Sequence, residues 1–90
     1  MEIRWTPEAS SCLENISLHI AENSPDAALK TVSNIFDRIE HLVHFPYVGR
    51  VGRIQGTREL VLAPLPYIAI YRVMDAAVEV LQILHGAQDR

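Results

Sequence analysis

The spacing of apolar residues in this chain changes once, near Pro46, and that change limits the fold more than any other feature. Before Pro46, apolar residues recur at helical spacing in two stretches; after it, they lie in short runs typical of strands. A chain of 90 residues has room for one hydrophobic core. We therefore predict a single α+β domain over residues 1–90.

Both helical stretches begin with a hydroxyl residue followed by proline. Thr6-Pro7 precedes the first and Ser24-Pro25 the second. The hydroxyl can cap the helix, and proline at the first helical position loses no needed hydrogen bond. The second helix should run to about His44, because Pro46 disfavours helix in the residue before it. Only a few residues separate the helices, so we expect an antiparallel hairpin.

Strand patterns flank this hairpin on both sides. A short extended segment comes before the first helix, and three runs with short turns follow the second. The order is β-α-α-β-β-β, which predicts an antiparallel sheet covered on one face by the helix hairpin. Glycines in the connection after Pro46 indicate an irregular loop. The predicted strands are Glu2–Trp5, Thr57–Leu62, Tyr67–Val73 and Val78–Leu84, and the loop glycines are Gly49, Gly52 and Gly56.

Alternation along the strands predicts which side chains share a face. Arg58 should lie beside Leu60, and Arg72 beside Ile70, so that the two arginines stand at the ends of an apolar face that one partner could cover. In the last strand, we expect one face to hold Val78, Val80 and Leu84 and the other to hold Leu81 and Ile83.

Basic residues gather in the second half of the chain. Residues 50–72 carry four basic residues and one acid, net +3, although the whole chain has a net charge of −3. Arginine pairs with carboxylates and phosphates in bidentate geometry, so this group predicts a site for an acidic partner or another anion. The alternative is a solvated surface, with Arg58 or Arg72 paired to Glu59 or Glu79. The predicted partner-binding residues are Arg50, Arg53, Arg58 and Arg72.

Histidines and tyrosines offer other chemistry. His85 ends the last predicted strand and could move a proton, since histidine titrates near neutral pH; the alternative is a structural role. His41 and His44 are three residues apart with no third ligand suggested, so we expect a solvated helix end and no metal site. Tyr67 and Tyr71 share a strand face and should pack on the helices instead of stacking bases.

Composition sets limits on the class of protein. Cys12 is the only cysteine, lies in an amphipathic pattern and should be a small core residue. The first residues lack the pattern of a signal peptide and no apolar run is long enough for a membrane span, so we expect the cytoplasm and no membrane. The acidic total argues against indiscriminate nucleic-acid binding. No cofactor is predicted.

Several short motifs occur along the chain in a fixed order and spacing. They are Pro46, Gly49-Arg50, Gly56–Leu60, Tyr71–Val73 and Ile83–Gly86. Together these motifs resemble the RelE/ParE superfamily of toxins from bacterial toxin–antitoxin modules. The resemblance covers essentially the whole chain, and the fold of that family is the same β-α-α-β-β-β arrangement that periodicity predicts.

The superfamily divides by mechanism, and the resemblance favours one branch. RelE-like members cut mRNA in the ribosome, are strongly basic and carry an arginine where this chain has Ile68. Their second helix is lysine-rich, whereas this one offers Lys30 and Arg38, and the C-terminal aromatic of some members is absent from His85–Arg90. ParE-like members end the last strand with Leu-His, as here, and are associated with poisoning of DNA gyrase.

The resemblance therefore implies a ParE-like toxin that inhibits growth through gyrase, takes part in plasmid stabilisation and is neutralised by a cognate antitoxin. The resemblance thus favours a protein that is not an enzyme and leaves the question open; if it is an enzyme, we expect an mRNA endoribonuclease. Two alternatives stay open: a ribosome-dependent mRNA endoribonuclease using Arg58, Arg72 and His85, and a non-toxic antitoxin-binding module. An antitoxin helix in a groove or an added strand would both fit, as would a homodimer or a toxin–antitoxin hetero-oligomer.

Overall fold

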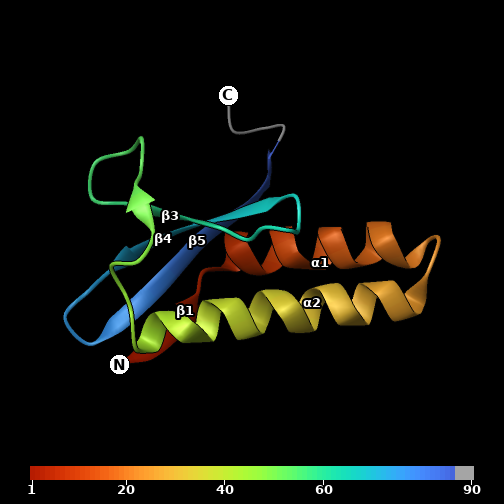
Figure 1. Cartoon of the computed structure of the whole chain (residues 1–90), viewed down its shortest axis with the longest axis horizontal. Coiled ribbons are helices and arrows are strands. Elements are labelled where there is room, and N and C mark those ends of the chain that lie inside the picture. Colours follow the sequence, from red (N-terminus) through yellow and green to blue (C-terminus); the bar gives the residue numbers. More distant parts are fainter. Residues whose placement is uncertain (87–90) are drawn as a thin grey trace.

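The computed structural model describes residues 1–86, which form two helices, a short 3-10 turn and one mixed sheet (Figure 1). Residues 87–90 lie outside the described part. They include most of the segment His85–Arg90, in which the C-terminal aromatic of some nuclease members is absent. The elements are β1 (Glu2–Trp5), α1 (Pro7–Ala21), α2 (Pro25–Glu40), η1 (His41–Val43), β2 (Arg50–Val51), β3 (Arg58–Val61), β4 (Tyr67–Val73) and β5 (Ala77–His85).

Both helices begin as the sequence predicts. The Thr6 hydroxyl accepts a hydrogen bond from the Ala9 amide, and the Ser24 hydroxyl caps α2 in the same way, so each satisfies an otherwise unpaired donor. α2 ends earlier than predicted, at Glu40 and not near His44. The chain tightens into η1 there, with the His44 amide donating to the His41 carbonyl at 3.1 Å shortly before Pro46.

The sheet has the strand order β1-β5-β4-β3-β2. β3, β4 and β5 form the predicted antiparallel meander. β1 lies parallel to β5, so the sheet is mixed, although the sequence predicted an antiparallel one. A parallel pair cannot be joined by a tight turn, and here two helices and strands β2 to β4 lie between its members in the chain. The predicted glycine loop is wrong at one point: Arg50–Val51 pairs with β3 as an edge strand, β2.

A β-bulge in β5 changes which of its residues share a face, so the faces predicted for the last strand are wrong beyond the bulge. Tyr71 pairs with Val80 but Ile70 pairs with Gln82, so Leu81 is the extra residue. Beyond the bulge the alternation shifts by one position, and Ile83, not Leu84, shares a face with Val80. The backbone amide of Thr6 donates to the Val80 carbonyl, and the Thr6 hydroxyl lies 3.1 Å from that oxygen and 3.2 Å from the Leu81 carbonyl.

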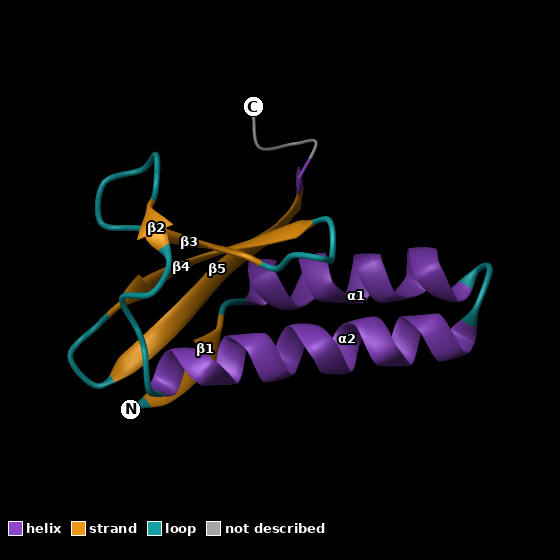
Figure 2. Cartoon of the chain, viewed as in Figure 1, coloured by secondary structure: helices purple, strands orange, loops and turns teal. Residues whose placement is uncertain are grey.

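Helices and sheet form two layers, with α1 and α2 side by side across one sheet face (Figure 2). Side chains between the layers make one core that includes the fully buried Tyr71; Cys12 packs against it from the side, as predicted. Tyr67 is partly buried against this core, so both tyrosines face the helices as expected. The core residues are Ala9, Leu13, Ile35, Ile39, Leu42, Leu62, Ala69, Tyr71, Val78, Val80 and Ile83.

Candidate functional site

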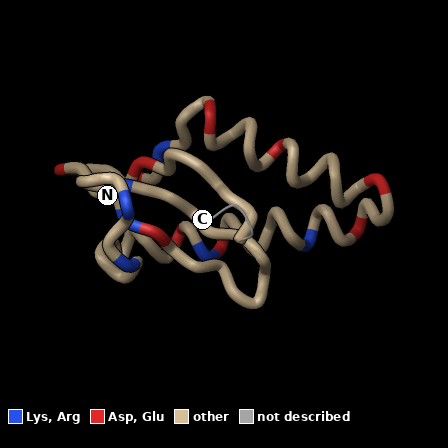
Figure 3. Tube along the Cα trace, turned by 90° about the horizontal axis from the view of Figure 1, so that it is seen from above, with Lys and Arg blue, Asp and Glu red and all other residues tan. Residues whose placement is uncertain are grey.

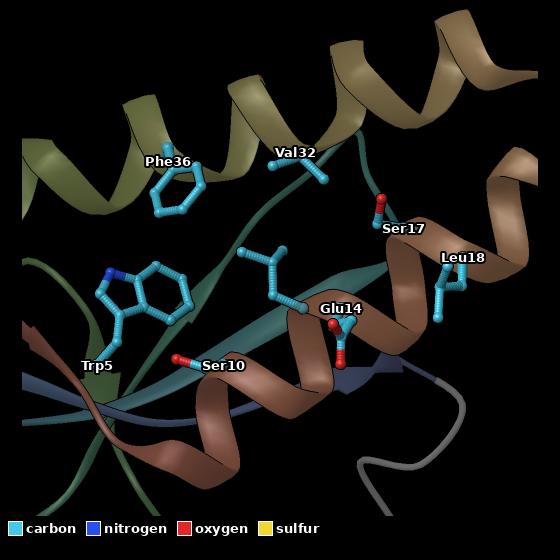
Figure 4. Close-up of a pocket in the computed structure, with 8 residues that line it drawn as sticks. Trp5, Ser10, Glu14, Ser17, Leu18, Val32 and Phe36 are labelled. Atoms are coloured by element: carbon cyan, nitrogen blue, oxygen red, sulfur yellow. The ribbon is translucent and has the colours of Figure 1, made fainter.

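An apolar groove lies between the two helices and runs from Trp5, just before α1, to Leu18 near the end of that helix (Figure 4). Its volume is about 640 Å³. Trp5 closes one end with its ring edge-to-face on Phe36, the ring centroids 5.2 Å apart. Leu18 and Phe36 remain exposed at its rim. The lining residues are Trp5, Ser10, Leu13, Glu14, Ser17, Leu18, Val32 and Phe36.

Residue size and helical spacing create this groove. Ser10, Leu13 and Ser17 recur at three- and four-residue intervals along one face of α1, and the two small serines leave space that larger residues would fill. Val32 and Phe36, four apart on α2, form the opposite wall. A groove of this size with an apolar lining suits one face of a partner helix.

The predicted basic residues do not form one cluster. Glu59, only 5% exposed, holds two of them: Arg50 Nε lies 2.9 Å from Glu59 Oε1, and the Arg53 backbone amide donates to Glu59 Oε2 at 3.4 Å. This buried carboxylate fastens β2 and the following loop onto β3. The sequence alternatives had placed Arg58 or Arg72 beside Glu59; the partner is Arg50.

Arg58 contacts the chain itself. Its Nη1 donates to the carbonyls of Gly49 (2.8 Å) and Tyr47 (3.2 Å), and its guanidinium lies 5.1 Å from the centre of the Tyr47 ring. These contacts hold residues 47–49, which lead into β2, in place, because one guanidinium can donate to several carbonyls at once. Arg58 therefore stabilises the fold of this chain whether or not a partner is bound.

Arg72 lies on the opposite face of the sheet from Arg58. Arg58 pairs across the strands with Tyr71, which faces the helices, and Arg72 is the next residue along β4. The prediction that one partner could cover an apolar face ending in both arginines is therefore wrong. Arg72 Nε forms an ion pair with Glu79 Oε1 at 2.6 Å, one of the pairings that the sequence suggested.

Tyr71 joins the sheet to the same segment. Its hydroxyl donates to the Pro46 carbonyl at 2.8 Å and accepts from the Gly49 amide at 3.0 Å. Burial raises the pKa of Tyr71 above its usual 10.0, although the Gly49 hydrogen bond and the nearby Arg58 charge act in the other direction. A Cβ on Gly49 would lie 2.6 Å from the Tyr71 hydroxyl, so glycine is required by this close approach.

The nuclease candidates are not brought together. His85 pairs with Tyr67 and stacks edge-to-face on it, 5.7 Å between ring centroids, whereas Arg58 pairs with Tyr71. Four residues of strand therefore separate His85 from Arg58, roughly 13 Å at the usual rise of a strand. Arg72 faces the other side of the sheet. No single phosphate can contact all three side chains in this arrangement.

Other predicted positions show no clustered chemistry. His41 and His44 are exposed at the end of the second helix and its 3-10 turn. Within residues 1–86, no three His, Cys, Asp or Glu residues come close enough together to hold a metal ion. Over the same residues, neither helix is long and apolar enough to cross a membrane.

The sequence allowed for an antitoxin helix in a groove, but it did not identify the residues that form this one. Trp5, Leu18 and Phe36 were not predicted as site residues. One signal pointed to them: the apolar stripe of α2 is wider than one packed face needs, so part of it, including Phe36, stays exposed. Leu18 stands outside the apolar stripe of α1.

The family model and both relatives describe toxins, and one relative carries the name RelE2. Residues 3–90 match the model of a family described as "ParE toxin of type II toxin-antitoxin system, parDE". The chain is 44% identical over 86 residues to "Putative toxin Y4kP" of Sinorhizobium fredii, covering 96% of this chain and 88% of that protein. It is 32% identical over 87 residues to "Toxin RelE2" of Caulobacter vibrioides, covering 97% of each.

A solved structure supports the fold as well. A chain of the "Chromosomal ParDE TA system from P. aeruginosa" superimposes with a TM-score of 0.84 and 31% identity, covering 94% of this chain and 95% of that one. At this coverage and TM-score, the two chains share the architecture described above.

Proposed function

Because this chain belongs to the family of ParE toxins of type II toxin–antitoxin systems, we propose that it inhibits bacterial growth in the cytoplasm by acting on DNA gyrase. We further propose that a cognate antitoxin neutralises it. The observation that supports this proposal over RNA cleavage is the separation of Arg58, Arg72 and His85 on the sheet. A ribonuclease needs a proton-transfer group and cations that reach the same phosphate.

Charge supports the same choice. Acidic positions are spread along both helices, whereas most basic ones lie at the sheet end (Figure 3). The first 49 residues carry three basic and seven acidic residues, net −4. Such a surface repels the phosphates of ribosomal RNA. A surface with both acidic and basic regions suits binding to a protein target better than binding to the RNA of the ribosome.

A supercoiling assay with purified gyrase tests the target. The expected result is concentration-dependent loss of supercoiling, together with intact mRNA when the protein is added to translating ribosomes. His85→Ala should inhibit gyrase like the wild type, because His85 stacks on Tyr67 and has no common site with Arg58. Rapid mRNA cleavage without any effect on gyrase would refute the proposal and support the ribonuclease alternative.

The antitoxin is proposed to fill the helix groove with the apolar face of a helix. Leu18 and Phe36 stand exposed at the rim and would become buried, and buried apolar anchors dominate the energy of such interfaces. Glu14 adds a polar group beside the apolar lining that can orient the incoming helix.

Two charge insertions test the groove. Leu18→Glu should weaken antitoxin binding at least about tenfold, ~1.4 kcal/mol, since it puts a carboxylate into the apolar contact. Met74→Glu is the matched control, because Met74 is an exposed apolar residue in the turn between β4 and β5, outside the groove. Titration calorimetry with the purified antitoxin measures both. Equal affinities for the two variants would exclude the groove as the site.

A further inference from the structure

The segment that leads into and follows β2 is unusually apolar for an exposed surface. Within residues 45–54, five large apolar side chains are between 64% and 77% exposed. Tyr47 and Val51 line a small pocket beside Arg58, and Ile54 lines another beside Glu59, so the exposed apolar residues flank both faces of this edge. Exposed apolar side chains gathered in this way mark a contact surface. We call it the β2 edge patch; its apolar residues are Phe45, Tyr47, Val48, Val51 and Ile54.

The patch surrounds the open edge of the sheet. β2 is the last strand in the order, and Arg50 pairs with Glu59 on its inner side. Two residues on, the Gly52 amide donates inward to the Thr57 carbonyl at 2.8 Å. Inward and outward hydrogen bonding alternate along an antiparallel strand, so the N–H and C=O of Val51 point away from β3. A further strand could pair there.

The charge of the patch selects what can pair. No acidic residue lies between Glu40 and Glu59, whereas Arg50, Arg53 and Arg58 all fall in that interval. Two copies of this chain pairing antiparallel around Val51 would set each Arg50 diagonally across from the other and join two basic edges, and like charges on neighbouring strands are destabilising. An acidic segment would be attracted to this edge where a second copy would be repelled, because half of the Arg50 side-chain surface stays exposed beside Glu59.

The edge is also held in place before any partner binds. Tyr71 fixes Pro46 and Gly49, and Arg58 fixes Tyr47 and Gly49, by the hydrogen bonds described above. A surface that is already ordered loses little entropy on binding. Exposed aliphatic side chains such as Val51 and Ile54 offer nothing to a phosphate backbone, whereas arginine mixed with aromatic and apolar residues is typical of protein interfaces.

We propose that β2 accepts an extended acidic segment of a partner protein as an additional strand. The main chain of Val51 supplies the hydrogen bonds, Arg50 and Arg53 attract the carboxylates of the segment, and the exposed apolar residues pack on its alternate side chains. This inference does not depend on gyrase as target or on the helix groove. It concerns a second surface, formed by the opposite edge of the sheet from β1.

The test uses the isotope-labelled protein and short capped peptides followed by NMR. The probe alternates glutamate with valine; one control replaces each glutamate by lysine, and another replaces the central valine by proline, which removes a strand donor. The glutamate peptide should shift the amide signals of residues 49–52. Both control peptides should bind much more weakly. A single-stranded oligonucleotide that shifts the same signals more strongly would overturn the proposal in favour of nucleic acid.

Variants of the protein sharpen the result. Arg50→Gln with Arg53→Gln should weaken the glutamate peptide about tenfold, because two charge pairs of up to ~1 kcal/mol each are lost. Arg4→Gln is the matched control: Arg4 lies on β1 at the other edge, and its side chain has the same 51% exposure as that of Arg50.

Val51→Pro separates strand pairing from simple charge attraction. It removes only the outward N–H, which an edge strand tolerates, so the fold should persist in the NMR spectrum while peptide binding is lost. Unchanged binding by Val51→Pro, equal loss in Arg4→Gln, or failure of the glutamate peptide to shift residues 49–52 would each refute strand addition at β2.

Discussion

Replacing Tyr71 by phenylalanine removes a single oxygen atom, and we predict a large loss of stability. The side chain is fully buried, and its hydroxyl donates to the Pro46 carbonyl and accepts from the Gly49 amide. Phenylalanine fills the same space without a cavity, so the whole effect comes from these two hydrogen bonds. No other polar side chain in the described structure bonds to either backbone group.

The size of the loss follows from what is left behind. Gly49 is buried, and its unsatisfied amide should cost about 1–3 kcal/mol. Pro46 is partly exposed, so water can reach its carbonyl, and that loss should stay near 0.5–1.5 kcal/mol. Together we expect about 2–4 kcal/mol, a large share of the total for a domain of this size. The melting temperature should fall by roughly 10–25 °C.

Urea unfolding followed by the fluorescence of Trp5, the only tryptophan, measures this difference. Tyr67→Phe is the matched control, since Tyr67 lies on the same face of β4 but has no hydrogen-bond partner for its hydroxyl within residues 1–86. The control should change stability by less than about 0.5 kcal/mol. A Tyr71→Phe protein within that margin of the wild type would show that the hydroxyl does not hold the segment before β2.

Three further predictions concern neighbouring contacts. The raised pKa of Tyr71 means that the folded protein holds this proton more tightly than the unfolded chain does, and the resulting contribution to stability is complete below pH 10. The urea midpoint of the wild type should therefore fall as pH rises through the folded pKa of Tyr71, and Tyr71→Phe should lack this part of the decline. Thr6→Val should cost about 1–2 kcal/mol in thermal unfolding and Thr6→Ser much less, because serine keeps a hydroxyl for the Ala9 amide and the β5 carbonyls. Glu59→Gln should speed hydrogen exchange at the Gly52 amide about fivefold, ~1 kcal/mol, through loss of the Arg50 ion pair; unchanged exchange would show that the carboxylate does not fasten β2.

The parts of the fold that the sequence predicted depend on neighbours along the chain. The helix starts at Thr6 and Ser24 were correct because a capping hydroxyl acts on an amide three residues away. The strand Tyr67–Val73 was correct to the residue, since β-branched and aromatic side chains fill its whole length. Such features need no knowledge of what packs against them.

The errors arose where distant residues decide the local structure. β2 has only two residues and glycines beside it, so it looked like a loop; Glu59 and Tyr71, far along the chain, give it an extended shape. The bulge at Leu81 has no local signal either. It lies where the Thr6 hydroxyl meets the Val80 and Leu81 carbonyls, a contact between residues more than seventy positions apart. One displaced residue then reversed the predicted faces of Ile83 and Leu84.

The same distinction governs how the arginines should be tested. A count of charges treats Arg50, Arg53, Arg58 and Arg72 as equivalent, but their surroundings differ. Arg58 bridges the Tyr47 and Gly49 carbonyls, so an alanine there disturbs the β2 edge patch even if no partner touches the guanidinium. Loss of binding in Arg58→Ala is therefore not evidence of a contact. Arg50 differs, because half of its side-chain surface is exposed beside Glu59.

A stability measurement separates these two roles. A contact residue should lower affinity with little change in melting temperature, whereas a residue that holds the edge in place should lower both together. By this criterion we expect Arg58→Ala to lower the melting temperature more than Arg50→Gln, because Arg58 loses its hydrogen bonds to two carbonyls whereas Arg50 loses one ion pair of about 1 kcal/mol with Glu59. Suppose that Arg50→Gln destabilised the fold as much as Arg58→Ala. The charge of Arg50 would then serve to hold β2 on β3, and the affinity for an acidic partner would have to be assigned to the apolar residues around Val51.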